Sequence, residues 1–143
     1  QMGIIQSVRE IPGFLSLLVV YILLVVKEHR LSAISVLILG AGVLATGFMP
    51  SFEGLMLTTF IMSVVFHYFE TTNQSLTLQY FTGLQSAVVF ARLKSLSALT
   101  NVFVGVSIWG LSYFLSLTSL FAIVGGVVIC AAVYAMKIDP ADK

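Results

Sequence analysis

Long apolar runs, interrupted at a few points by charged or turn-forming residues, dominate the chain. Residues 31–52 and 95–136 carry no charged side chain. A membrane-spanning helix needs about 20 apolar residues, because it rises about 1.5 Å per residue through about 30 Å of hydrocarbon. The first run is long enough for one such helix and the second for two. These runs far exceed the roughly 10-residue alternating segments of a β-barrel, so the pattern predicts an all-α integral membrane protein.

Local helix signals divide the chain into five predicted membrane helices. Pro50 ends the second one, because the residue before a proline is displaced from the helical region. Ser51 is placed to cap the third, with Glu53 in its first turn. A hairpin at 116–119 separates the last two, and Asp139-Pro140 stops the last. The predicted helices are 3–27, 31–50, 54–80, 94–115 and 118–137 within a single domain, 1–143, and residues 82–93 form an amphipathic linker helix.

The composition agrees with this pattern and excludes several classes of protein. Apolar residues make up 59% of the chain and charged residues only 9%, and the mean hydropathy is +1.07. A soluble surface needs about 25–35% charged residues, so a soluble domain and a disordered chain are excluded. The net charge of +1 gives no basic footprint for nucleic acid. The bilayer is the expected surrounding of the chain.

No catalytic or metal-binding motif stands out. The chain lacks a nucleophile elbow, a zinc-protease motif and a phosphate-binding loop, so it is not expected to be an enzyme. The single cysteine, Cys130, can form no internal disulfide. The two histidines, His29 and His67, are far apart in predicted depth and have no cysteine nearby. The sequence therefore predicts neither a metal site nor a cofactor.

Basic residues in the predicted loops set the orientation. Lys27 and Arg30 lie between the first two helices, Arg92 and Lys94 between the third and fourth, and Lys137 follows the fifth. The other two loops contain no Lys or Arg. Under the positive-inside rule the basic loops are cytoplasmic, which places the N-terminus outside and the C-terminus in the cytoplasm of a plasma or inner membrane. An outside start with no signal peptide predicts one further helix upstream.

Polar residues interrupt the third predicted helix. His67, Glu70, Thr71 and Gln74 follow a spacing that places them on one helix face, and Asn73 lies beside them. An ionisable group at the centre of a membrane helix costs at least about 2.5–3.5 kcal/mol, so it is by default a functional candidate. The group is predicted to bind a polar solute or a proton. The alternative is a helix that leaves the membrane early, with these residues at a wet cytoplasmic end.

Arg9 and Glu10 form a second candidate site in the outer third of the first predicted helix. They directly precede Pro12-Gly13, where a kink can open backbone groups. The pair either lines the outer mouth of a cavity, with Glu10 as a binding candidate, or lies at the interface with its side chains reaching water.

Small and polar residues recur on the fourth predicted helix. Ser97, Asn101 and Gly105 are spaced at four residues. They either line a pathway, with Asn101 as a binding candidate, or pack against another helix, because small residues let backbones approach closely. Packing alone is predicted for the small residues of the second helix (Ala41 and Ala45, with Gly40, Gly42 and Gly47) and of the fifth (Ala122, Gly126 and Cys130).

Three segments of the chain resemble the major facilitator superfamily. Residues 70–80 are similar to the inner part of that family's fourth helix, 90–101 to the cytoplasmic start of its fifth, and 137–140 to the exit of its sixth. The whole five-helix layout resembles helices two to six of the N-terminal half of the 12-helix fold. The C-terminal half, helices eight to twelve, repeats the same topology and stays an alternative.

One loop departs from the family pattern. The family has a glycine-rich loop with Asp and several basic residues between its second and third helices, whereas this chain has only residues 27–31, without glycine. The resemblance implies that Glu28 stands for the acidic member and Arg30 for a basic one. It further implies that Arg92 belongs to the inner gate.

The resemblance implies that the chain is part of a secondary active transporter, which moves a small polar solute by alternating access. Coupling of this movement to protons is compatible with the resemblance. The partners of the chain would be the remainder of the transporter or a second copy of the chain. A non-transport scaffold or assembly subunit that binds partner helices is the main alternative. A membrane enzyme that uses His67 and Glu70 is a more remote one.

Overall fold

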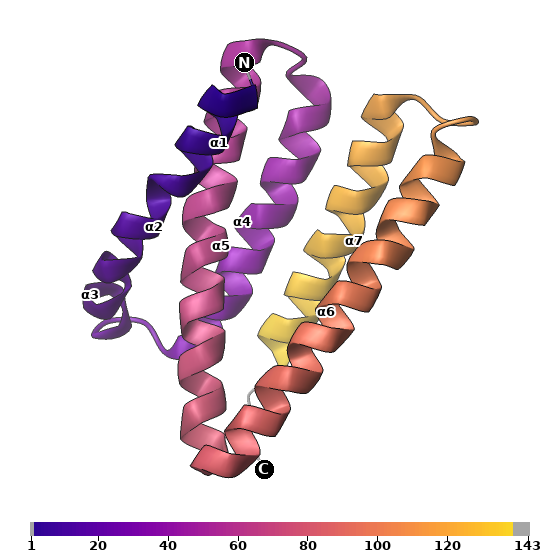
Figure 1. Ribbon diagram of the computed structural model, residues 1–143. Helices are drawn as coiled ribbons and strands as arrows, with labels where there is room; N and C mark the ends of the chain where they lie inside the picture. Colours follow the sequence, from indigo (N-terminus) through magenta and orange to yellow (C-terminus); the bar gives the residue numbers. More distant parts are fainter. Residues whose placement is uncertain (1, 139–143) are drawn as a thin grey trace.

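The computed structural model describes residues 2–138, which form eight helical segments and no strand (Figure 1). In chain order they are α1 (Met2–Glu10), α2 (Pro12–Leu15), the 3₁₀ helix η1 (Ser16–Leu18), α3 (Val19–Leu23), α4 (Glu28–Phe48), α5 (Phe52–Tyr80), α6 (Gly83–Leu111) and α7 (Leu117–Lys137). Four of them, α4 to α7, are long and apolar enough to cross a membrane. For the described residues, the all-α prediction is confirmed.

The first predicted membrane helix is not continuous. Pro12 has no backbone N–H, and its ring clashes with the carbonyl four residues earlier, so α1 ends at Glu10. The Ser63 hydroxyl of α5 donates a hydrogen bond to the Arg9 carbonyl oxygen beside the break. The prediction of one helix over 3–27 is therefore wrong, and short segments that lie along α5 replace it (Figure 1).

Helix α4 lies at the centre of the helix packing, because it packs along both α5 and α7. The contact with α7 is close enough to require glycine. A Cβ atom on Gly125 would lie 2.9 Å from the Gly40 carbonyl oxygen and 2.9 Å from the Leu44 nitrogen. On the other side of α4, a Cβ on Gly42 would meet the side chain of Met62 in α5. Close approach at small residues is the usual way in which helices associate in lipid.

Gly40, Gly42 and Gly47 of α4 pack as predicted, but Ala41 is exposed, and the stripe predicted for α7 does not pack against the described chain. Gly126 has no atom within 4 Å of an added Cβ, and Cys130 is exposed. The face that meets α4 includes Gly125 and Ala132, one helical position away from the predicted stripe. Small residues lie on both faces of α7, so residue size alone did not identify the packed face.

Helix α6 is longer and more isolated than predicted. It begins at Gly83, after a capping box in which the Gln85 side chain accepts from the Thr82 backbone N–H. Residues 83–93 are therefore the first part of α6, with Thr82 as its N-cap, and the prediction of a separate linker helix over 82–93 is wrong. Only Ser86 is buried on this helix, and Leu99 is 66% exposed. Helix α6 has few contacts with α5, so most of its surface is uncovered by the described chain.

The helix ends alternate between the two ends of the molecule. The connections from α4 to α5 and from α6 to α7 lie at the end where α1 begins, and the other connections lie at the opposite end (Figure 1). The Ser51 side chain accepts from the Gly54 backbone N–H, as the predicted cap requires, and Ser116 accepts from Ser119. The expected stop at Asp139-Pro140 lies outside the described residues.

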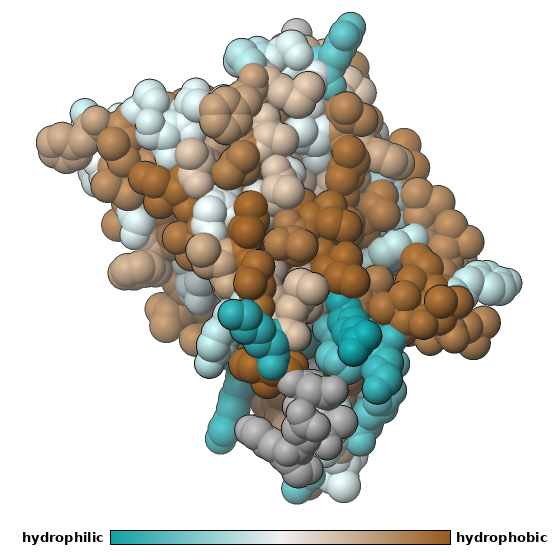
Figure 2. Space-filling model, turned by 180° about the vertical axis from the view of Figure 1, so that it is seen from behind, coloured by the Kyte–Doolittle hydropathy of each residue, from teal (hydrophilic) through white to brown (hydrophobic). Residues whose placement is uncertain are grey.

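The polar surface is concentrated at one end. Lys27, Arg30 and Lys137 all belong to the end opposite the α4–α5 connection. Seen from behind in Figure 2, apolar side chains cover the middle of the molecule, and strongly polar ones gather toward the lower end. This distribution is typical of a helical protein that spans a bilayer.

The close α4–α7 contact leads to a stability prediction. Both Gly125→Ala and Gly126→Ala gain helix propensity, but only the first places a methyl group against the α4 backbone. Gly125→Ala is expected to be less stable than Gly126→Ala by about 1–3 kcal/mol. Unfolding in mixed micelles with increasing SDS, followed by circular dichroism, measures the difference. Equal stability of the two variants would show that α4 and α7 do not approach this closely.

Candidate functional site

Two polar clefts lie on different sides of α5, and Phe66 lines both. The α5–α6 cleft has a volume of about 360 Å³. The α1–α5 cleft has a volume of about 320 Å³. The first is lined by Phe66, Phe69, Glu70, Asn73, Leu93, Lys94, Leu96, Ser97, Thr100 and Asn101. The second is lined by Arg9, Glu10, Leu39, Thr59, Met62, Ser63, Phe66 and His67.

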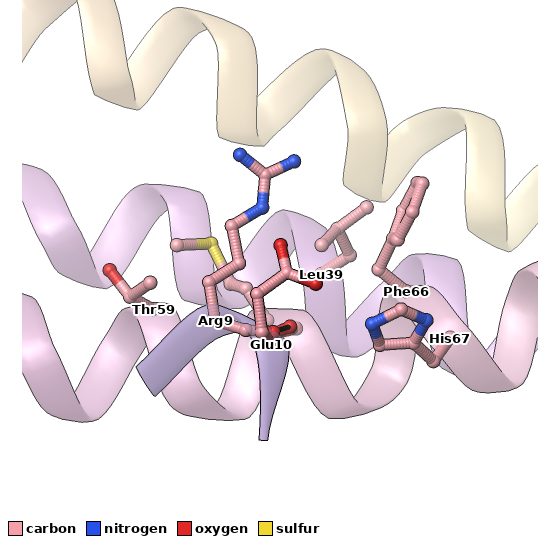
Figure 3. Close-up of a pocket in the computed structure, with 8 residues that line it drawn as sticks. Arg9, Glu10, Leu39, Thr59, Phe66 and His67 are labelled. Carbon is pink, nitrogen blue, oxygen red and sulfur yellow. Dashed lines mark hydrogen bonds between the residues drawn. The ribbon is translucent and has the colours of Figure 1, made fainter. Parts of the chain in front are cut away.

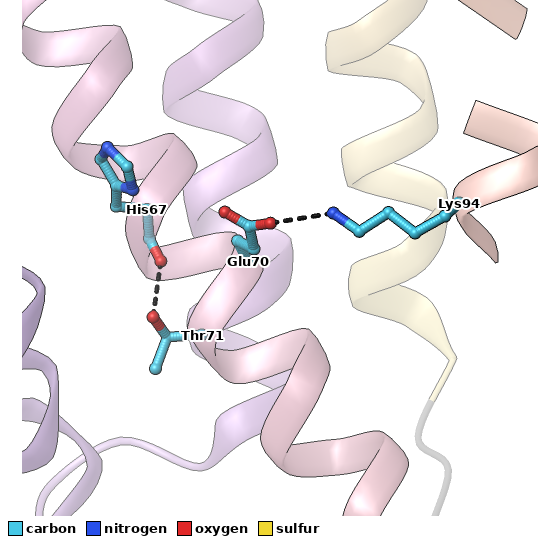
Figure 4. Close-up of polar contacts among 4 residues, drawn as sticks. All are labelled: His67, Glu70, Thr71 and Lys94. Atoms are coloured by element: carbon cyan, nitrogen blue, oxygen red, sulfur yellow. Dashed lines mark hydrogen bonds and ion pairs between the residues drawn. The ribbon is translucent and has the colours of Figure 1, made fainter. Parts of the chain in front are cut away.

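An ion pair joins the two walls of the α5–α6 cleft. Lys94 Nζ of α6 donates to Glu70 Oε1 of α5 over 3.1 Å (Figure 4). The Glu70 side chain is 34% exposed and that of Lys94 is 75% exposed. Glu70 lies about 15 Å from the Tyr80 end of α5, and Lys94 about 17 Å from the Gly83 end of α6, at 1.5 Å per residue. The two charges therefore lie at matching heights, well inside both helices.

Amide and hydroxyl groups flank this ion pair. Asn73 lies one turn from Glu70 on α5, while Ser97 and Asn101 follow Lys94 along the facing side of α6. The Thr100 hydroxyl donates to its own helix, to the Leu96 carbonyl oxygen at 2.8 Å. In the described chain, Ser97 and Asn101 of the stripe on α6 thus line a cleft, and Gly105 lies outside it with no neighbouring helix within 4 Å of an added Cβ.

The α1–α5 cleft forms where the first segment breaks. Arg9 and Glu10 at the end of α1 face the part of α5 that carries His67 (Figure 3). The Glu10 carboxylate accepts a hydrogen bond from Gln6 Nε2 at 3.0 Å. Next to the break, a Cβ atom on Gly13 would lie 3.8 Å from His67 Nε2. The sequence treated these groups as two separate candidates, and the structure brings them to one cleft.

The polar face predicted for the third helix is divided between the clefts. Glu70 points toward α6, whereas His67 points away from Lys94 (Figure 4). The Thr71 hydroxyl donates to the His67 carbonyl oxygen at 2.8 Å, within its own helix. Gln74 is exposed and lines neither cleft. Of the predicted group, Glu70 and Asn73 face Asn101 across one cleft, and His67 joins Glu10 in the other.

The inner-gate candidates lie on two helices, Glu28 and Arg30 in the first turn of α4 and Arg92 on α6. Ser75 Oγ of α5 donates to Glu28 Oε1 at 2.8 Å, which fixes the start of α4 against α5. Arg30 on α4 and Arg92 on α6 are exposed. The structure therefore gives Glu28 a contact between helices and leaves both arginines at the surface of the described chain.

Lys94 is the residue that the sequence analysis missed as a site residue. It was counted only as a loop charge, because the fourth helix was predicted to begin at residue 94. Glu70 and Lys94 lie almost equally far along the chain from the turn at residues 81–82. Antiparallel helices joined by a tight turn place such residues at the same height. A correct start for α6 would have placed the two charges opposite each other.

No group of three or more His, Cys, Asp or Glu side chains that could hold a metal ion occurs within residues 2–138. No protein-family model, curated protein or solved structure matches the chain. The arrangement of the site therefore carries the functional argument by itself.

Water access distinguishes a polar cleft from a lipid-facing surface. In a Cys130→Ser background, Ser97→Cys lies in the α5–α6 cleft, and Leu99→Cys lies two residues further along α6, outside it. We expect a membrane-impermeant thiol reagent to modify Ser97→Cys in native membranes at least about tenfold faster, because thiolate forms only where water reaches. Mass spectrometry gives the two rates. Equal rates would mean that the cleft is not a water-filled site.

Proposed function

We propose that this chain is part of a secondary active transporter that moves a small polar solute, and that the α5–α6 cleft is its solute site. The observation that carries the proposal is the opposed pair Glu70–Lys94, with Asn73 and Asn101 beside it, well inside two helices of spanning length. Charged side chains inside membrane helices face partners or water-filled cavities, and they mark substrate and ion pathways.

A half-fold of the major facilitator type accommodates this arrangement. In that architecture, α4 and α7 are outer helices, and α5, α6 and the broken first segment face the central cavity. Three features support it: α4 and α7 pack on each other, both clefts adjoin α5, and α6 is largely uncovered. The remaining helices of the transporter, or a second copy, would cover α6. Alternating access would follow from rocking of the two halves.

The proposal assigns roles to the site residues. Glu70 binds a proton or a cationic group, and Asn73 and Asn101 form hydrogen bonds with the solute. His67 and Glu10, in the other cleft, are candidates for a proton pathway on the outer side. Broken helices near such sites are a recurrent feature of transporters, since their freed backbone groups line the cavity.

The proposed setting is a plasma or inner membrane. Lys27, Arg30 and Lys137 share one end of the molecule, which is the cytoplasmic end under the positive-inside rule. Glu28 and Arg30, with Arg92 of α6, are the proposed inner-gate residues, and the Ser75–Glu28 hydrogen bond supports a fixed start of α4 there.

A scaffold or assembly role is the second candidate. It is favoured by α6, on which only Ser86 is buried, because such a surface is also suited to a permanent partner helix. A scaffold predicts that cysteines in the α5–α6 cleft stay closed to water. A transporter predicts that their reactivity changes when solute is added.

Replacement of the cleft carboxylate tests the transport proposal. Membrane vesicles that contain the native polypeptide are expected to accumulate one of a panel of radiolabelled small polar solutes, compared with vector-only vesicles. Glu70→Gln is expected to lower this accumulation at least about 100-fold, because it removes the carboxylate that binds the proton or the cationic group of the solute. Protein blots verify equal insertion.

Glu53→Gln is the matched control. Glu53 lies in the first turn of α5, outside both clefts, and its loss should leave accumulation unchanged. The transport proposal fails if no solute accumulates above the vector level, or if Glu70→Gln transports like the wild type.

A further inference from the structure

We infer that the α5–α6 cleft binds a small zwitterion, which carries one ammonium group and one carboxylate on a short skeleton. This inference rests on the proposed function and names its substrate class. The ammonium group lies against α5, and the carboxylate lies against α6. The solute takes the place of the direct contact between Glu70 and Lys94 and links the two helices through itself.

The charge of the cleft is the first argument. Glu70 and Lys94 are the charged residues among those that line it, so the site has one negative and one positive group. A solute with a net charge would pair with one of them and leave the other without a partner. An unpaired charge inside a membrane helix bundle is strongly unfavourable. A zwitterion leaves both protein charges paired.

The α5 wall is suited to the cationic end. Phe66, Phe69 and Glu70 lie at i, i+3 and i+4, so they share one face of α5, and all three line the cleft. Aromatic faces next to a carboxylate attract ammonium groups, including methylated ones, through the ring quadrupole and the charge. No basic residue of α5 lies in this cleft.

The α6 wall is suited to the carboxylate end. Lys94, Ser97 and Asn101 lie at i, i+3 and i+7, again on one face. They offer an ammonium, a hydroxyl and an amide, all of which donate hydrogen bonds to a carboxylate. The acidic residue of the cleft, Glu70, belongs to the other wall. The two walls thus have opposite preferences and set the direction of a zwitterion between them.

The ion pair is easily exchanged, and the cleft is small. Lys94 is 75% exposed on a flexible four-carbon stem, so solvent weakens its attraction to Glu70 and the head group is free to swing. The volume of about 360 Å³ lies at the lower end of the range for ligand pockets, about 300–1,000 Å³. Both features favour a solute of a few heavy atoms that replaces the direct salt bridge.

Two sets of probes that differ only in charge test the inference on the purified native polypeptide in detergent. The first set is L-alanine (zwitterion), L-alaninamide (cation) and L-lactate (anion). The second is glycine betaine, choline and 3,3-dimethylbutanoate. Equilibrium binding is measured by calorimetry at millimolar concentrations or below. In at least one set, the zwitterion is expected to bind about tenfold or more tightly than both charged probes.

Charge variants make the test reciprocal. Glu70→Gln leaves a net positive cleft and should prefer the anion of the set, while Lys94→Met leaves a net negative cleft and should prefer the cation. The exchanged pair Glu70→Lys/Lys94→Glu keeps the cleft neutral and should keep its preference for the zwitterion. This double variant, monitored for a monodisperse elution profile, covers the case in which a single variant does not fold.

The outcomes separate the inference from the proposed function. The inference is overturned if neither zwitterion binds saturably, if a charged probe binds the wild type best, or if the preferences of the folded variants do not change. Flux into proteoliposomes is measured with the same probes. Zwitterion binding without flux retains the inference and removes transport. Flux of a solute with no charge preference retains transport and removes the inference.

Discussion

Glu70 is a carboxylate well inside α5, a helix long and apolar enough to cross a membrane, and a charge at such a position needs a partner or water. Its partner is Lys94 of α6, whose Nζ lies 3.1 Å from Glu70 Oε1. The cleft lies between the two helices that carry this pair. Three of the polar side chains buried in α5 are satisfied within the helix, because Thr58, Thr72 and Thr77 each donate to one of its own backbone carbonyls. The buried Ser63 hydroxyl and the Glu70 carboxylate instead bond to other segments, to α1 and α6 respectively.

The remaining architecture holds α5 in position for this contact. Helix α4 fixes α5 on one side and α7 on the other, with the closest approach at Gly40 and Gly125. The broken first segment lies on α5 as well, where Ser63 satisfies the Arg9 carbonyl. Helix α6, by contrast, has few such contacts, and the Glu70–Lys94 ion pair is one of those that join it to α5. A solute that bridges these groups would therefore couple binding to the position of α6.

The sequence predicted the all-α class, the long apolar helices and the helix cap at Ser51, because hydrophobic length and capping residues are local properties. It did not predict the break at Pro12 in full, since the cost of opening a helix depends on whether a neighbour such as Ser63 satisfies the freed carbonyl. It also misplaced the start of α6 at residue 94, because a capping box at Thr82 looks like the start of a short linker. That error hid Lys94. The sequence also did not predict which face of α7 packs against α4, because both faces carry small residues and the choice depends on the three-dimensional arrangement of the two helices.

The central claim is that the α5–α6 cleft is an interior site, completed by helices beyond the ones described. The most direct test is the mass of the native complex, tagged at its own locus, extracted in mild detergent and measured by light scattering. Twelve helices of about 20 residues with their loops need roughly 400 residues, so the account predicts a protein mass near three times the 15.5 kDa of this chain, or twice 15.5 kDa if a second copy completes the site. A complex of 15.5 kDa, in which α6 stays uncovered, would contradict it.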